Sequence, residues 1–141
     1  MPAFVHEQQI RVRYADTDQY GVVYYANYLV YFEVGRTEFM RSRGQTYRSL
    51  EESGVYLAVT EATCRYRAPL QYDDQVLVLT WISDIGKTRM TFEYGIHRLE
   101  GDERRQVAEG FTTLACITGN GKPRRIPDGL RALAAEAMES S

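Results

Sequence analysis

The sequence predicts an α+β fold in which an antiparallel sheet covers one long helix. A segment that starts at Tyr25 has apolar residues at helical spacing, and four long segments of strand character follow it with short turns between them. Helices and strands do not alternate as they would in a parallel α/β fold. The chain has 141 residues, and no repeat or linker divides it, so we expect 1–141 to form one domain.

The first strand is expected at His6–Tyr14, where side chains alternate between two faces. After a polar turn, the long helix is expected from Tyr25 until Gly44 ends it. Its buried stripe is predicted from residues three or four positions apart: Tyr25, Tyr28, Leu29, Phe32, Phe39 and Met40. The spacing also predicts two ion pairs on the outer face: Glu33 with Arg36 and Glu38 with Arg41.

A short helix is expected next, capped by Thr46 and ended by Gly54. Four strands are then predicted in succession: Val55–Arg67, Gln75–Ser83, Lys87–Leu99 and Arg105–Thr118. Turn residues separate these strands, as in an antiparallel sheet. After them, Asp128 can cap a last helix whose apolar face is formed by Leu130, Leu133, Ala134 and Ala137.

The composition argues against several classes of protein. Seventeen Lys and Arg residues against nineteen Asp and Glu residues give a net charge of −2, so no charge excess favours nucleic acid. No apolar run approaches the roughly 20 residues of a membrane helix, and the N-terminus does not resemble a signal peptide, so we expect a cytoplasmic protein. Cys64 and Cys116 have no neighbouring Cys or His at metal-ligand spacing and are expected to be reduced thiols.

The strongest candidate for a functional site is the stretch from Asp16 to Tyr28. It contains two acids, a turn glycine and the start of the long helix. A calcium-binding EF-hand loop would need different ligands at Tyr20 and Asn27 and a helix in front, where we predict a strand. An Asp-x-Asp nucleophile of the phosphatase type follows a buried apolar strand, which residues 11–14 are not.

A pair of carboxylates ahead of a helix remains as the chemical interpretation. A helix start offers unpaired N–H groups and the positive end of the helix dipole, which can polarise a carbonyl or hold an oxyanion. A carboxylate beside it could act as a nucleophile or as a general base on water. The alternative is that Asp16 and Asp18 are ordinary turn and capping residues.

The run from Asp16 to Tyr28 (DTDQYGVVYYANY), with YFE at 31–33 and RTE at 36–38, resembles the signature of the 4-hydroxybenzoyl-CoA thioesterase family. That family includes the acyl-CoA thioesterases associated with the bacterial Tol-Pal system. The segments YRAP at 66–69, DD at 73–74 and KPRRIP at 122–127 resemble it at matching distances. The resemblance covers residues 10–127 and implies the hotdog fold, a curved antiparallel sheet of about five strands wrapped around one long helix.

The resemblance also implies roles for individual residues. Asp18 would be the catalytic carboxylate, acting either on the acyl carbon or on water, and the backbone N–H near Tyr25 would polarise the thioester carbonyl. The phosphates of coenzyme A would bind to Gly86, Lys87, Thr88, Arg124 and Arg125, although a solvated turn and a solvated basic run are the alternative interpretation. Many Tol-Pal-associated members have His in place of Tyr25, and 4-hydroxybenzoyl-CoA enzymes often have Pro in place of Gln19, so the resemblance identifies the family and not the subfamily.

The predicted function is therefore hydrolysis of acyl-CoA to a free acid and coenzyme A, without a metal or an organic cofactor. One alternative is a non-catalytic hotdog module that binds acyl groups or a carrier protein. A hotdog dehydratase or hydratase would need a His beside an acid, and the motif contains none. Hotdog relatives pair their sheets across a two-fold axis, and open sheet edges are usually covered, so we expect a homodimer or homotetramer with sites between subunits. An acyl carrier protein is a second candidate partner.

Overall fold

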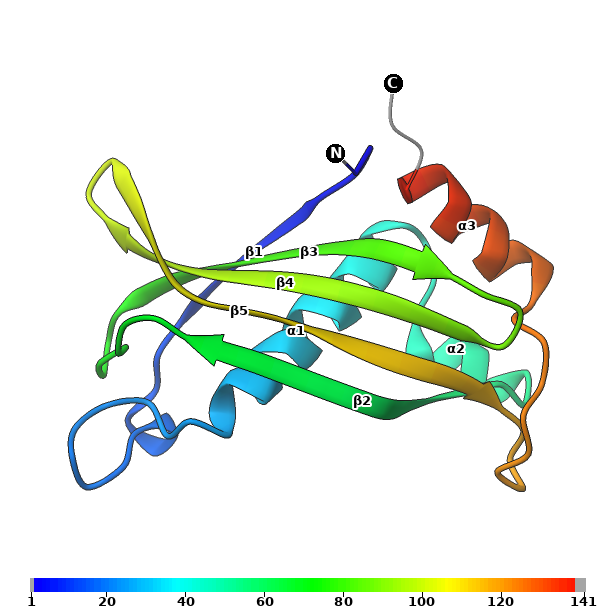
Figure 1. Cartoon of the computed structure of the whole chain (residues 1–141), viewed down its shortest axis with the longest axis horizontal. Helices are drawn as coiled ribbons and strands as arrows, with labels where there is room; N and C mark the ends of the chain where they lie inside the picture. Colours follow the sequence, from blue (N-terminus) through cyan, green and yellow to red (C-terminus); the bar gives the residue numbers. More distant parts are fainter. Residues whose placement is uncertain (1, 139–141) are drawn as a thin grey trace.

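The computed structural model describes residues 2–138, which form one curved antiparallel sheet around a long helix (Figure 1). The strand order is β1-β3-β4-β5-β2. The strands are β1 (His6–Arg11), β2 (Tyr56–Tyr66), β3 (Gln75–Ile85), β4 (Arg89–Glu100) and β5 (Glu103–Ile117). The helices are the 3₁₀ turn η1 (Tyr14–Asp16), the long helix α1 (Asn27–Ser42), α2 (Tyr47–Glu52) and α3 (Asp128–Met138). The predicted α+β fold is confirmed, with all five strands and three helices in the expected order.

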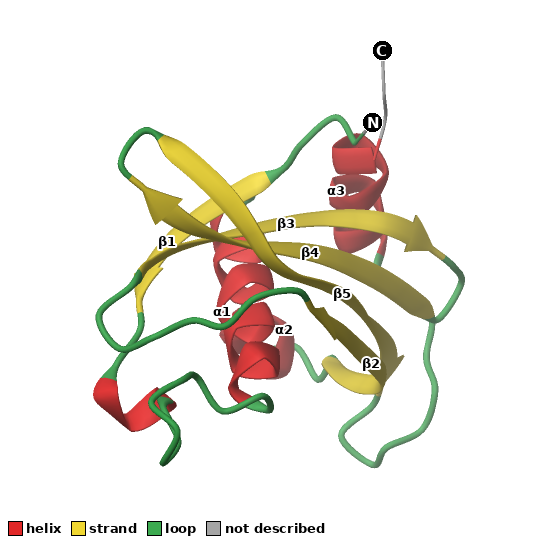
Figure 2. Cartoon of the chain, turned by 60° about the vertical axis from the view of Figure 1, so that its left-hand side comes forward, coloured by secondary structure: helices red, strands yellow, loops and turns green. Residues whose placement is uncertain are grey.

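The core lies between one face of the sheet and α1, which Figure 2 shows beneath the curved strands. Phe32 of α1 stacks on Tyr94 of β4 with 4.3 Å between the ring centroids, and Phe39 meets Phe92 edge-on at 5.7 Å. All four side chains are at most 1 % exposed. Burying a large apolar side chain contributes roughly 1.5–3 kcal/mol, so these contacts fix α1 against the sheet.

At Gly35, α1 comes unusually close to β3. A Cβ atom at this position would lie 2.7 Å from Cγ1 of Val78 and closer still to Oγ1 of Thr80. Both neighbours are buried β-branched side chains with little freedom to move. Glycine at this position therefore sets the distance between helix and sheet, and with it the position of the start of α1.

The buried stripe of α1 differs from the predicted one near its start. Tyr25 is 62 % exposed and Leu29 is 39 % exposed, whereas Tyr31 is only 4 % exposed. The helix begins at Asn27, so Tyr25 lies in the turn before it and does not belong to the helical stripe. Tyr28, expected in the core, is buried as predicted.

One of the two predicted ion pairs on α1 is absent. Arg36 was expected to pair with Glu33 outside, but it is buried and its Nε donates to the hydroxyl of Tyr47 at 3.1 Å. The guanidinium points inward because α2 packs its tyrosine over this part of the helix. The second pair is present, with Nε of Arg41 3.4 Å from a carboxylate oxygen of Glu38.

The first strand is shorter than predicted and gives way to a turn. It ends at Arg11, and η1 follows at Tyr14–Asp16. Val12 leaves the pairing with β3, and its N–H donates to the carbonyl of Asp74 at 3.0 Å.

The helices of residues 2–138 do not include one with the length and apolar character of a membrane-spanning segment.

The end of the molecule that carries α3 lies opposite the loop before α1 (Figures 1 and 2). Arg131 of α3 donates to the carbonyls of Gly86 and Lys87 in the β3–β4 turn, at 2.9 and 3.1 Å. Arg43, after the last residue of α1, lies 3.4 Å from Glu136 of α3. The fold thus has two distinct ends, one at the start of α1 and one at the β3–β4 turn.

Candidate active site

Asp18 lies in a tight loop between η1 and α1. Thr17 and Val23 form an isolated antiparallel bridge at the base of the loop. The N–H of Asp18 donates to Val22 O at 2.9 Å, and the N–H of Gly21 donates to Asp18 O at 3.0 Å. Gly21 has a φ of +82°, which L side chains rarely adopt. These bonds hold the motif in a tight hairpin loop that contains Asp18.

The carboxylate of Asp18 has one hydrogen bond within the described residues. Its Oδ1 accepts the N–H of Tyr20 at 2.8 Å, and no side chain of residues 2–138 pairs with it. Asp18 lies near the residues just before α1, because Thr17 pairs with Val23 and the Tyr24 N–H donates to Asp16 O at 2.9 Å. A half-exposed carboxylate with a free oxygen is available to a substrate or to water.

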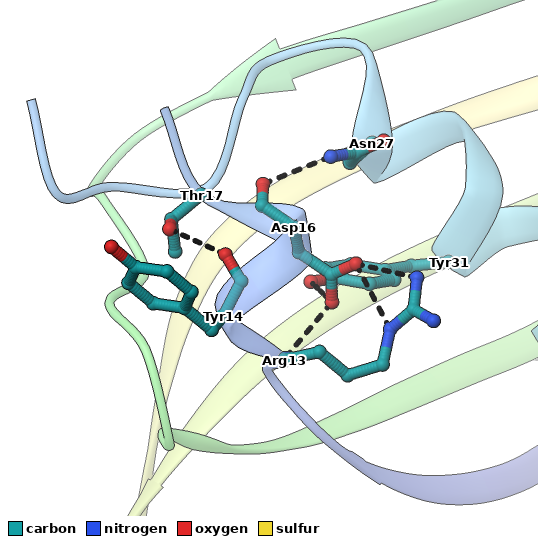
Figure 3. A network of polar contacts seen from close by, with 6 residues as sticks. All are labelled: Arg13, Tyr14, Asp16, Thr17, Asn27 and Tyr31. Carbon is teal, nitrogen blue, oxygen red and sulfur yellow. Dashed lines mark hydrogen bonds and ion pairs between the residues drawn. The ribbon is translucent and has the colours of Figure 1, made fainter. Parts of the chain in front are cut away.

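The neighbouring acid, Asp16, is engaged in a different way (Figure 3). It is 4 % exposed, and its carboxylate accepts from the Arg13 guanidinium at 2.8 Å, from the Arg13 backbone N–H at 3.0 Å and from the Tyr31 hydroxyl at 3.0 Å. Burial alone would raise the pKa of Asp16, but the hydrogen bonds from Arg13 and Tyr31 together with the charge of Arg13 lower it. Asp16 is thus an ionised structural group whose oxygens are occupied.

The main chain of Asp16 ties the Asp18 loop to the long helix. Its carbonyl accepts the Tyr24 N–H and the side-chain amide of Asn27, both at 2.9 Å. Tyr31 of α1 holds the carboxylate of the same residue. Asp16 therefore fixes the position of the loop relative to the start of α1.

Two backbone N–H groups just before α1, those of Tyr25 and Ala26, have no acceptor within the described residues. The turn bonds from Asn27 N to Tyr24 O, Tyr28 N to Tyr25 O and Leu29 N to Ala26 O use the first N–H groups of the helix. The N-cap residue is Ala26, whose side chain cannot accept a hydrogen bond. The positive end of the helix is thus left open beside the Asp18 loop.

Tyr66, which is distant from the motif in the sequence, contacts the turn before α1. Tyr66, the last residue of β2, donates its hydroxyl to the carbonyl of Tyr25 at 2.8 Å. Its ring meets Tyr28 edge-on, with 5.0 Å between centroids. The sheet therefore holds the residue that carries one of the free N–H groups.

The predicted phosphate-binding residues gather at the other end of the molecule. The N–H of Ile126 donates to Lys87 O at 3.0 Å, and the N–H of Cys116 donates to Thr88 O at 2.7 Å. These bonds bring the turn and the basic run together: Gly86, Lys87 and Thr88 with Arg124 and Arg125. Lys87 and Arg125 are exposed. Within one chain, the β3–β4 turn of this cluster and the loop between η1 and α1 lie at opposite ends of the fold (Figure 1).

A sequence model of the Thioesterase-like superfamily matches residues 12–133. The chain belongs to this superfamily. YneP of Bacillus subtilis is 41 % identical over 98 residues, which are 70 % of this chain and 71 % of that protein. The acyl-CoA thioester hydrolase YbgC of Escherichia coli is 32 % identical over 122 residues, 86 % of this chain and 89 % of that protein.

Solved structures agree with this membership. The DHNA-CoA thioesterase of Staphylococcus aureus superposes with a TM-score of 0.85 at 31 % identity, over 93 % of this chain and 89 % of that one. The family resemblance, the hotdog fold and the class of enzyme expected for this thioesterase from its sequence are confirmed.

Several contacts of the candidate site could not be predicted from local spacing. The spacing of the motif does not distinguish Asp16 from Asp18; the family resemblance selects Asp18, and the contacts of Arg13 and Tyr31 show that Asp16 is the buried acid. Tyr66 stands 41 residues from Tyr25. No local spacing predicts a contact between such distant residues.

Proposed function

We propose that this chain hydrolyses the thioester bond of acyl-CoA, giving a free acid and coenzyme A, with Asp18 as the catalytic carboxylate. Its carboxylate either attacks the acyl carbon or takes a proton from the attacking water. The observation that carries the proposal is a carboxylate with a free oxygen beside an uncapped helix start, in a member of a thioesterase superfamily. Asp16 does not suit the role, because its oxygens already accept four hydrogen bonds.

The helix start supplies the second part of the chemistry. Attack on the thioester carbon moves negative charge onto the carbonyl oxygen, and a fixed N–H aimed at that oxygen stabilises the transition state. The N–H of Tyr25 is free to serve, whereas the N–H of Tyr24 is occupied by Asp16 O. The partial positive charge at the helix end adds to the effect.

The basic cluster suits the phosphates of coenzyme A. Arg side chains match phosphate geometry, and the exposed Lys87 adds a positive charge that can approach from solvent. We propose that Lys87, Arg124 and Arg125 bind these phosphates, with Gly86 and Thr88 shaping the turn that presents Lys87.

We further propose that the site forms between two copies of the chain. Within the sheet of the described residues, β2 is an edge strand of eleven residues with only β5 beside it, and it exposes apolar side chains such as Val59. Long uncovered edges invite pairing with another strand. Its ends are roughly 34 Å apart, with Tyr66 bonded to Tyr25 at one end and Tyr56 paired with Ile117 near the basic cluster at the other.

Antiparallel pairing of two β2 strands would create a shared site. The Asp18 loop of one copy would then lie beside the basic cluster of the other copy. The reacting carboxylate and the phosphate-binding residues would then come from different chains of a homodimer, or of a homotetramer built from two such pairs.

The proposal is tested by thioester cleavage, followed with a thiol reagent on acetyl-, octanoyl-, palmitoyl- and benzoyl-CoA. We expect Asp18→Asn to fold normally and to lose most of kcat, because an amide keeps the shape but cannot act as a base or a comparable nucleophile. Asp16→Asn is the matched control and should lose less kcat. The reverse ranking would show that Asp18 is not the catalytic group, and a wild-type chain that binds but cleaves no thioester would instead indicate a binding module.

An acyl carrier protein is a second donor worth testing. The chloroplast protein ATL2 of Arabidopsis thaliana, named an acyl-acyl carrier protein thioesterase, is 36 % identical over 126 residues, 89 % of this chain and 66 % of that protein. A comparison of kcat/KM for the same acyl group on coenzyme A and on a carrier protein decides between the two donors. A carrier-protein preference would overturn the assignment of the basic cluster to coenzyme A.

A further inference from the structure

We propose that Tyr66 is a positioning residue for the oxyanion donor: from the end of β2, its hydroxyl fixes the carbonyl of Tyr25 and so aims the free N–H groups beside it. This inference rests on the proposed function, in which those N–H groups polarise the thioester carbonyl. Tyr66 itself need not touch the substrate.

The bond from Tyr66 is the shorter of two that hold the Tyr25 carbonyl. The hydroxyl lies 2.8 Å from the carbonyl oxygen, whereas the Tyr28 N–H, the other donor among the described residues, lies 3.3 Å away. The helix alone therefore holds this carbonyl only weakly. Without the tyrosine, the turn before α1 would lose its best fixed point.

Fixing this carbonyl also fixes a donor. The carbonyl of Tyr25 and the N–H of Ala26 belong to one planar peptide group and point in opposite directions. Holding the oxygen toward Tyr66 therefore aims the Ala26 N–H away from the helix, and it restricts the rotation of Tyr25, which carries the second free N–H. A hydrogen bond accepted by a carbonyl also polarises its peptide group, which makes the N–H a better donor.

This arrangement anchors the turn without using up the donors. A Ser, Thr or Asp at the N-cap would hold the helix start by accepting from its N–H groups. Ala26 cannot do this, and Tyr66 instead donates to a carbonyl. The start of α1 is held in place while its positive end stays available to an oxyanion.

Tyr66 is itself well fixed. It pairs with Ala108 of β5, and the next N–H, that of Arg67, donates to Val107 O at 2.8 Å. Its ring packs edge-on against the buried Tyr28. The Tyr66 side chain is 48 % exposed, but its partial desolvation, followed by the influence of the nearby Cys64 thiol, raises its pKa to about 12, so the hydroxyl keeps its proton at neutral pH. A rigid strand thus positions a group in a loop.

The test removes the hydroxyl alone with Tyr66→Phe. Tyr56→Phe is the matched control, because it removes a tyrosine hydroxyl from the other end of the same strand, away from the Tyr25 carbonyl. We expect Tyr66→Phe to lower kcat about tenfold, the size of one neutral hydrogen bond, with KM within about twofold and a circular dichroism spectrum that matches wild type. Tyr56→Phe should leave kcat unchanged.

The dependence on the donor is measured by repeating Tyr66→Phe in two backgrounds. In Tyr25→Ala, which keeps the N–H, the loss should again be about tenfold. In Tyr25→Pro, which lacks this N–H and keeps only that of Ala26, the further loss should be clearly smaller, because Tyr66 then has one donor fewer to position. Equal losses in both backgrounds would overturn the role of Tyr66 in positioning the Tyr25 N–H. If Tyr25→Pro is as active as Tyr25→Ala, the Tyr25 N–H is not an oxyanion donor, and the proposed oxyanion site fails independently of Tyr66.

A second measurement does not depend on the proline variant or on activity. The amide resonance of Ala26 in a ¹H–¹⁵N spectrum should move in Tyr66→Phe, because its peptide loses the bond to the carbonyl, and should stay in place in Tyr56→Phe. An unchanged Ala26 resonance in Tyr66→Phe would overturn the inference.

Discussion

Replacing Tyr25 with proline removes one backbone N–H from the proposed oxyanion site and breaks no hydrogen bond of residues 2–138. The Asn27 N–H donates to Tyr24 O at 2.8 Å and closes a turn in which Tyr25 is the second residue. Proline is favoured at that position, because its fixed φ suits the turn. The Tyr25 side chain is 62 % exposed, so its loss removes little packing. The variant should therefore fold and lack only the donor and the tyrosine ring.

The expected size of the effect follows from the chemistry of one oxyanion donor. Removing such a donor typically costs about 10²–10³ in kcat, or roughly 3 kcal/mol of transition-state stabilisation. Tyr25→Ala is the control for the lost ring, so the proline variant should fall that far below the alanine variant. The assay is steady-state release of coenzyme A, with circular dichroism to establish that both variants are folded. A folded proline variant as active as the alanine variant would refute the reasoning.

Three further predictions address the loop, the helix and the basic cluster. Asp16→Asn should lower the free energy of unfolding by about 2 kcal/mol at neutral pH. Because the pKa of Asp16 is lowered in the folded protein, its stabilising contribution is complete above the ordinary carboxyl pKa and is lost as the pH falls through the pKa of the folded state. The difference in unfolding free energy between Asp16→Asn and wild type should therefore vanish in acid. Denaturation curves of the two proteins that stay apart in acid would contradict this. Gly35→Ala should lower the free energy of unfolding by about 1–3 kcal/mol through overpacking, whereas Gly129→Ala, where a Cβ meets open space, should not lower it. Equal unfolding midpoints for the two variants would reject the close approach of α1 to the sheet. Removing a charge from the basic cluster should raise KM more than it lowers kcat, because the phosphates are remote from the reacting carbon; the variants are Lys87→Ala, Arg124→Ala and Arg125→Ala. Added salt should raise the KM of the wild-type protein in the same way. An unchanged KM in all three variants would reject the phosphate site.

Much of the fold could be predicted from the sequence, because local patterns determine it. The alternation in β4 and the cap at Thr46 were sufficient for those elements. The start of α1 was predicted two residues early, because Tyr25 continues the apolar spacing although its turn lies outside the helix. Arg36 was placed outside because helical spacing to Glu33 was visible in the sequence, whereas the contact with Tyr47 was not.

The candidate site was less predictable for the same reason. The motif showed that Asp18 and the helix start are neighbours in the chain. It could not show that Asp16 is buried against Arg13, or that Tyr66 reaches Tyr25, since both follow from packing. The bond between Ile126 and Lys87, which brings the basic segments together, also joins segments far apart in the sequence.

The most direct test of a site shared between two copies uses mixed dimers. Asp18→Asn chains carrying one affinity tag are refolded with Lys87→Ala/Arg124→Ala/Arg125→Ala chains carrying another, and doubly tagged dimers are purified. Each such dimer would contain one intact site, with Asp18 from one chain and the basic residues from its partner. We predict about half the wild-type rate per dimer at acyl-CoA concentrations well below the KM of the triple variant, since one of two symmetric sites is restored. A rate no higher than half that of the triple-variant dimer would contradict the account, because it would place Asp18 and the basic residues of each site in the same chain.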